Sequence, residues 1–335
     1  MNLIKITQLI LFVLLMIPSF LNAQASKFLE TERFAFYNHF WFNLHHFAKH
    51  EAVLNTHLDS SIIDTEEWKQ LNTNEEISLK KLIEYYKKNL VDKDLRTDDY
   101  MFDFKLWVLT QEEDGLEEIP VAFSEHCQQL LSAQQAYKNH FWHKHRTANE
   151  SIVQYNLQWI KDSEMELSEK LANLTYSYWQ DEKIRVDLSF YAKADKWNTR
   201  DKPYTNLHPE THIVMNTDSN EYPGNWFELL FHESSHHLIR TRTGFVSGTI
   251  NDISKTLNQK SPRQLWHAYL FYFSGKVVQE FLQENGVPNY ELYMVRNRVF
   301  SRNFKLIDTH LPAYIEGKST LHDVTKKIIQ AANQK

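Results

Sequence analysis

Residues His232-Glu233-Ser234-Ser235-His236 follow the pattern H-E-x-x-H, with two histidines four positions apart and a glutamate directly after the first. Side chains at i and i+4 lie on one face of a helix, so both imidazoles can reach the same metal ion. Glu233 then stands beside a water held by that metal, where its carboxylate can accept a proton. The motif predicts a zinc site formed by His232 and His236, with Glu233 as the general base.

The motif needs a helix, and the flanking residues favour one. Pro223 and Gly224 break the preceding chain, and Asn225 is a good N-cap residue. Glu228, three residues later, suits the reciprocal hydrogen bonds of a capping box. Gly244 is the expected end of this helix.

A zinc site of this type usually takes a third protein ligand. Ser261-Pro262-Arg263-Gln264 is a helix-start pattern, and the helix that it predicts runs to Gly286. Two candidate ligands lie on this second helix. His267 shares its face with apolar and small side chains, whereas Glu280, four residues after Lys276, suits an exposed ion pair. We expect His267 to be the third ligand, with Glu280 as the alternative.

The order of a strand (Thr211–Asn216), the H-E-x-x-H helix and a second ligand-bearing helix resembles the zincin metallopeptidases, and among them the gluzincin-like branch. The residues after His236 (HLIRTRTG) do not supply the metzincin extension. The second helix (LWHAYLFYFSGKVV) departs from gluzincins, because it lacks their N-E-x-x-S/D motif. In these respects the chain resembles uncharacterised exported bacterial proteins with a zincin-like core.

The resemblance implies that residues 183–335 are a zincin-like catalytic region that hydrolyses peptide or other amide bonds with zinc. It implies that the strand Thr211–Asn216 is the edge strand above the metal and binds an extended substrate by strand addition. An oxyanion donor is also needed. His310 and Tyr314, at i and i+4 in HLPAYIEG, are candidates, and a simple cluster at a helix end is the alternative.

The chain as a whole is expected to be mainly α-helical with a small β-sheet. Only 7 Gly and 8 Pro occur in 335 residues, which is few for a protein with many turns. Helical periodicity dominates residues 24–182, and strands are expected only at Ile184–Tyr191 and Thr211–Asn216. The expected division is therefore a helical region at 24–182 followed by the catalytic region.

Residues 1–23 have the three parts of a secretory signal peptide: a basic start with Lys5, a short apolar run before Pro18, and Ala23 at the cut. Cleavage would leave a secreted or periplasmic protein without a stable membrane anchor. An uncleaved N-terminal anchor is the alternative. The single cysteine, Cys127, excludes an intramolecular disulfide.

The formal net charge is −6, so the chain lacks the basic excess of nucleic-acid-binding proteins. The other histidines leave two interpretations open. His46 with His50, or the cluster His140, His143 and His145, would form a second metal site, or these aromatic-rich segments would line the substrate cleft. Two other functions also stay open: a non-catalytic binding protein with a structural metal site, and a zinc amidase acting on non-peptide amides.

Overall fold

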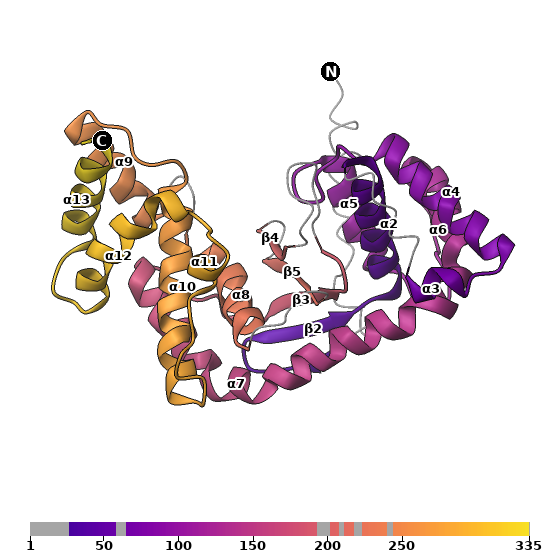
Figure 1. Cartoon of the computed structure of the whole chain (residues 1–335), viewed down its shortest axis with the longest axis horizontal. Helices are drawn as coiled ribbons and strands as arrows, with labels where there is room; N and C mark the ends of the chain where they lie inside the picture. The colour runs from indigo at the N-terminus through magenta and orange to yellow at the C-terminus, as the bar shows by residue number, and fades with distance from the viewer. Residues whose placement is uncertain are drawn as a thin grey trace, which may run out of the picture.

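A small mixed β-sheet lies between two groups of helices in the computed structural model of the chain (Figure 1). The protein is mainly α-helical with this one sheet in the part described, as the sequence predicts. The predicted signal peptide, residues 1–23, lies outside the described residues. The structure describes residues 27–57, 65–192, 202–207, 211–217, 223–239 and 244–334.

The sheet has five strands in the order β1-β2-β3-β5-β4. The three inner strands β2, β3 and β5 run parallel, and the two outer strands β1 and β4 are antiparallel to their neighbours. The strands are β1 (Lys27–Glu30), β2 (Phe34–Asn38), β3 (Ile184–Ser189), β4 (Tyr204–Asn206) and β5 (His212–Asn216).

Strands β3 and β5 confirm the two strands expected from the sequence. The expectation of helix alone before residue 182 is wrong for residues 27–38, because β1 and β2 come from that region and β2 pairs with β3. Phe34 and Phe36 in β2 are fully buried. The chain after β2 continues as an aromatic segment, residues 40–42, so its pattern does not distinguish a short buried strand from the start of a helix.

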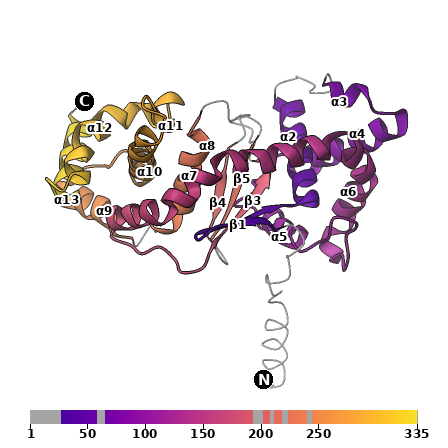
Figure 2. The same ribbon diagram turned by 90° about the horizontal axis from the view of Figure 1, so that it is seen from below.

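Helices of the first group surround one end of the sheet, and the long helix α7 runs from this group to the second (Figures 1 and 2). A 3₁₀ turn (Val121–Phe123) precedes α6, and a π-helical segment (Lys138–Trp142) joins α6 to α7. The helices are α2 (Phe40–His57), α3 (Glu66–Lys69), α4 (Thr73–Asn89), α5 (Asp99–Val108), α6 (Ser124–Tyr137) and α7 (His143–Thr175).

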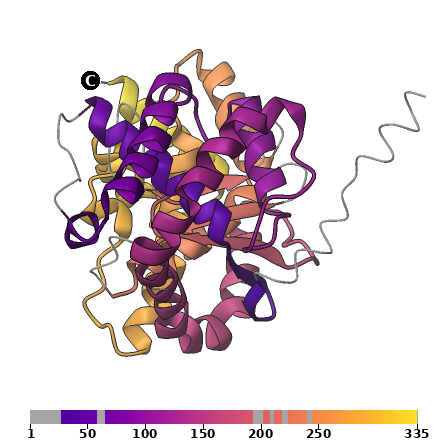
Figure 3. The same ribbon diagram turned by 90° about the vertical axis from the view of Figure 1, so that its right-hand side faces the viewer.

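The second group contains the helices of the predicted metal site. Seen from the end that carries the first group, the second group lies behind it (Figure 3). A 3₁₀ turn (Ser235–His237) continues α8. The helices are α8 (Asn225–Ser234), α9 (Phe245–Leu257), α10 (Leu265–Glu284), α11 (Tyr293–Arg296), α12 (Ser301–Ile315) and α13 (Leu321–Asn333).

Two hydrophobic cores meet at the sheet, because alternate residues of a strand point to opposite faces. In β5, Ile213 and Met215 belong to the core that contains α8 and α10, whereas Val214 belongs to the core built around α2, α4 and α6. The sheet and α7 thus support both helical groups. Among the described residues, no helix combines the length and apolar character needed to cross a bilayer.

Candidate metal centre

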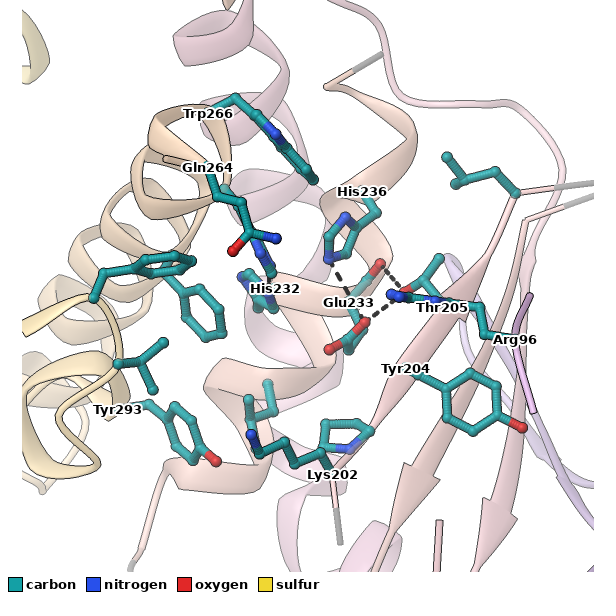
Figure 4. Close-up of a pocket in the computed structure, with 17 residues that line it drawn as sticks. Arg96, Lys202, Tyr204, Thr205, His232, Glu233, His236, Gln264, Trp266 and Tyr293 are labelled. Atoms are coloured by element: carbon teal, nitrogen blue, oxygen red, sulfur yellow. Dashed lines mark hydrogen bonds and ion pairs between the residues drawn. The ribbon is translucent and has the colours of Figure 1, made fainter. Parts of the chain in front are cut away.

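Three histidines, from α8, from the 3₁₀ turn after it and from α10, converge on one point, as Figure 4 shows for His232 and His236. The ligand nitrogens of His232, His236 and His267 all lie within 4.8 Å of one another. The Nε2 atoms of His232 and His267 are 3.2 Å apart, a spacing that suits two ligands of one metal ion. In the described part of the chain, this is the one group of three or more His, Cys, Asp or Glu side chains close enough to share a metal.

Helix α8 positions His232, although its start differs from the expectation. Gly224, with φ of 89°, occupies the N-cap position, and no side chain caps the helix. The predicted Asn225 cap and its capping-box partner Glu228 are therefore wrong. Glu228 is buried instead and accepts hydrogen bonds from the Tyr290 hydroxyl (2.6 Å) and the Tyr293 backbone N–H (2.9 Å).

The end of α8 also differs from the expectation. The α-helix ends at Ser234, and His236 lies on the 3₁₀ turn that follows. The rings of His232 and His236 are still close, in an edge-to-face arrangement with centroids 5.0 Å apart. Gly244 does not end this helix, because it is the N-cap of α9.

Helix α10 supplies His267 in its first turn. The helix begins at Leu265 with Gln264 as its N-cap, so the predicted start at Ser261 is three residues too early. Gly286, with φ of 95°, follows the C-terminal end as predicted. Phe271, one turn after His267, stacks on the His232 ring with centroids 3.5 Å apart and fixes that ring against α10.

The three imidazoles are electrically neutral in this setting. Burial, and then the neighbouring histidines, hold the pKa of His232 and of His236 well below the usual value. Burial, followed by the charge of Arg96, lowers the pKa of His267 to about 4. Neutral imidazole is the form that binds a metal.

A serine hydroxyl behind the His232 ring suits a role of His232 as a metal ligand. The Ser274 hydroxyl donates to the Leu270 carbonyl at 2.9 Å, and its oxygen lies 3.5 Å from Nδ1 of His232. A proton on Nδ1 would point to that oxygen and leave the Nε2 lone pair directed at the other histidines. The donor set therefore fits a divalent metal. Imidazole suits several first-row metals, so these contacts do not identify zinc.

Glu233 lies next to the histidines without being a member of their group. One carboxylate oxygen, Oε2, is 2.6 Å from the Thr205 hydroxyl and 3.7 Å from Nε2 of His236. Thr205 belongs to β4, which is the edge strand beside the site (Figure 4). The expectation that residues 211–216 form this edge is wrong, because β5 lies between β3 and β4.

The histidines and Glu233 line a pocket of about 560 Å³, here called the histidine pocket. Trp266, Phe271 and Tyr293 form an aromatic wall of this pocket. Arg96 and Lys202 also line it, and Figure 4 shows Arg96 beside Thr205 of β4. A volume of this order suits a peptide segment or another small ligand.

The two predicted oxyanion donors do not line the histidine pocket. Tyr314 donates its hydroxyl hydrogen to the Leu174 carbonyl at 2.8 Å and packs against Phe273. His310 lies on the same helix, α12, and is not part of the pocket. This placement agrees with the alternative of a cluster at a helix end and contradicts the oxyanion role.

The alternative third ligand, Glu280, is placed away from the histidines. Its carboxylate is exposed and lies 3.1 Å from the Lys170 ammonium on α7. The predicted ion pair with Lys276 is wrong, since the Lys276 ammonium donates to Gln279 at 2.8 Å. His267 is therefore the candidate that the fold brings to the motif.

The other histidine-rich segments do not line the pocket as a cleft wall. His46 is fully buried, with Nε2 3.0 Å from the Tyr204 hydroxyl. His145 is buried with Nδ1 2.8 Å from the Tyr137 hydroxyl, and Nε2 of His140 lies 3.1 Å from the Glu75 carboxylate. These three histidines are each bonded to another side chain of the protein. No second metal cluster is found among the described residues.

Arg96, Thr205 and Tyr293 are among the residues of the pocket wall that sequence reasoning missed. Arg96 lies between α4 and α5, far from the motif in sequence, and nothing local marks it. Thr205 lies in a strand of three residues, which is too short for a reliable alternating pattern. Only Pro203, the residue directly before this strand, is typical of the start of an edge strand.

No family model matches this chain, and neither the search of curated proteins nor that of solved structures finds a match. The resemblance to zincins thus depends on the H-E-x-x-H motif and the order of elements, and it stays a prediction.

Proposed function

We propose that this protein is an exported, zinc-dependent hydrolase that cleaves peptide bonds. The observation that supports the proposal most is the convergence of His232, His236 and His267 beside Glu233, in a pocket wide enough for a peptide segment. His267 is 31 residues beyond His236 along the chain, so a helix rich in histidine would not by itself bring it there.

In this proposal the three histidines would hold the metal, and the Ser274 hydroxyl would orient His232 from behind. When bound, zinc lowers the pKa of water and polarises a carbonyl group. Glu233 accepts the proton of the attacking water and delivers it to the leaving nitrogen. Thr205 keeps the carboxylate turned toward the pocket through its 2.6 Å hydrogen bond.

The aromatic wall of the histidine pocket favours apolar and aromatic side chains as neighbours of the bond that is cut. Trp266 stacks on His267 with ring centroids 4.9 Å apart, and Phe271 continues the same surface. The three residues of β4 are all buried, so we do not extend the strand-addition expectation to this edge. In this proposal the substrate binds instead to the side-chain surface of α10 and α11.

Removal and return of the metal test this function. Purified protein, treated with a chelator and then supplied with zinc, is offered unfolded polypeptides and, separately, cell-wall amides. We expect cleavage of polypeptides that stops on chelation and returns with zinc. Cleavage of the cell-wall amides alone would favour the amidase alternative. Zinc binding without any cleavage would favour the non-catalytic binding protein.

A further inference from the structure

A second pocket, lined by three arginines, adjoins the histidine pocket. Arg263, Arg298 and Arg302 line this space of about 430 Å³, here called the arginine pocket. Gln264 and Phe300 line both pockets, so the two spaces share a wall. The Phe300 ring lies 5.4 Å from the His267 ring, measured between centroids. A ligand that extends past Phe300 would therefore meet the arginines next.

The charge of the arginine pocket is not balanced by protein carboxylates. No Asp or Glu lines it, and none of its three guanidinium groups has an ion-pair partner among the described residues. Some other basic side chains on the surface pair with acids, as Lys80 does with Glu76. The chain as a whole has 43 acidic against 37 basic residues. A group of three unpaired arginines in an acidic protein indicates a place for an external anion.

The backbone around the arginine pocket adds to its positive potential. Helices α10 and α12 both begin there, and neither has an acid in its first turn or a side-chain N-cap hydrogen bond. By contrast, α4 has the Asn72 cap with Glu75. The unpaired N–H groups of a helix start attract anions. Gln264, Arg298 and Phe300 also have φ near +55°, +54° and +53°, a costly conformation that is typical of functional sites.

We propose that the arginine pocket binds a carboxylate of the substrate, so that the enzyme prefers peptides with an acidic residue or a free C-terminus beside the bond that it cuts. This inference rests on the proposed function. Guanidinium groups match carboxylates through paired N–H···O hydrogen bonds. A nucleic acid is the less suitable anion, since three arginines form a short patch and the net charge is −6.

Binding of labelled peptides to the E233Q variant tests the inference without cleavage. Three fluorescein-labelled peptides share one sequence: the first has Glu at three positions and an amidated C-terminus, the second has Gln there and the same amide, and the third has Gln and a free C-terminus. We expect at least one carboxylate-bearing peptide to bind about tenfold more tightly than the Gln amide. The preference should weaken as salt is raised. The first and third peptides separate side-chain from terminal carboxylates.

A matched pair of triple variants locates the effect. In R263Q/R298Q/R302Q, still with E233Q, the preference should fall to less than about twofold. The control K161Q/K255Q/K326Q removes the same charge from exposed lysines outside both pockets and should keep the preference. Thermal unfolding checks both triples, and R302Q alone replaces the arginine triple if that triple does not fold.

Equal affinity for all three peptides would overturn the inference, as would an equal loss in the lysine control. Tighter binding of a single-stranded oligonucleotide than of the acidic peptide would also overturn it. Cleavage is not measured here, so the result is independent of the catalytic proposal. If the wild type cuts neutral peptides but shows no preference for carboxylates, the proposed function stands and the anion site is wrong. If the preference is found without cleavage, the anion site stands and the proposed function is wrong.

Discussion

His267 is the proposed ligand that would distinguish a metal centre from a histidine-rich helix face. Its replacement in H267A should weaken zinc binding by at least about 100-fold, because loss of supporting groups outside the ligand set alone costs about 10- to 100-fold. The matched variant E280A removes the alternative ligand, whose carboxylate pairs with Lys170, and should leave zinc affinity unchanged. Competition with a zinc-binding dye measures both. Full zinc affinity in H267A would show that the third ligand is another residue.

The residues that sequence reasoning found share one property: their roles follow from local spacing. His232 and His236 belong to one motif, and the face and capping pattern of the next helix pointed to His267. Thr205 and Arg96 could not be found in this way, because they reach the pocket through the pairing of β4 with β5 and the packing of the first helical group. Contacts distant in sequence leave no periodic signal.

At the scale of the element, Gly224 shows why the start of α8 was misplaced. Capping preference favoured Asn225, but the left-handed conformation one residue earlier decides the start. A Cβ on Gly224 would lie 2.5 Å from Cδ1 of Leu282 and 2.7 Å from Cε2 of Tyr290. The tight packing of α8 against α10 and the segment after it therefore requires glycine, which local preference does not reveal.

The variant G224A should lower the free energy of unfolding by more than about 2 kcal/mol, through the left-handed conformation and the close contacts together. The control G248A lies within α9, where a Cβ would meet nothing within 4 Å, and should stabilise the protein by about 0.5–1 kcal/mol. Urea unfolding measures both. Equal behaviour of the two variants would contradict this role of Gly224.

Strand β2 was missed for a different reason. Strand prediction depends on alternation of apolar and polar residues, and β2 is buried through its first three residues. A parallel strand inside a sheet loses that alternation. The coarse result, a mainly helical protein with a small sheet, could be predicted from composition and periodicity. The pairing of the N-terminal strand β2 with β3 could not be predicted in this way.

For the whole molecule, Glu228 couples stability to pH. Burial raises its pKa to about 7, and hydrogen bonds from Tyr290 and the Tyr293 backbone oppose this rise. Between the unfolded pKa of 4.5 and about 7, the unfolded chain has lost the proton that the folded protein keeps. This group therefore makes folding less favourable as pH rises through that window, and its contribution is constant above it.

The variant E228Q lacks this titration. Its free energy of unfolding, relative to wild type, should rise steadily from about pH 4.5 to about pH 7 and then level off. Urea unfolding at several pH values measures the difference, in which the titrations shared by the two proteins cancel. A difference that does not change with pH would mean that Glu228 ionises in the folded protein as it does in the unfolded chain.

Export is a prediction about the full chain and is tested apart from the fold. We expect the mature protein to begin at Gln24 and to occur outside the cytoplasm, because an apolar run before Pro18 is followed by Ala23. N-terminal sequencing of the protein from the periplasm or medium measures this. A soluble cytoplasmic pool with Met1 intact would contradict export.

The central claim is that a metal held by three histidines and a base at Glu233 act together. The most direct measurement compares wild type with E233Q, both loaded with zinc, for metal content and for the rate of polypeptide cleavage. Glu233 is not a member of the histidine group, and Gln keeps its shape. We therefore expect equal zinc content and a rate at least about 100-fold lower in E233Q. Equal cleavage by the two proteins at equal zinc content would contradict the claim.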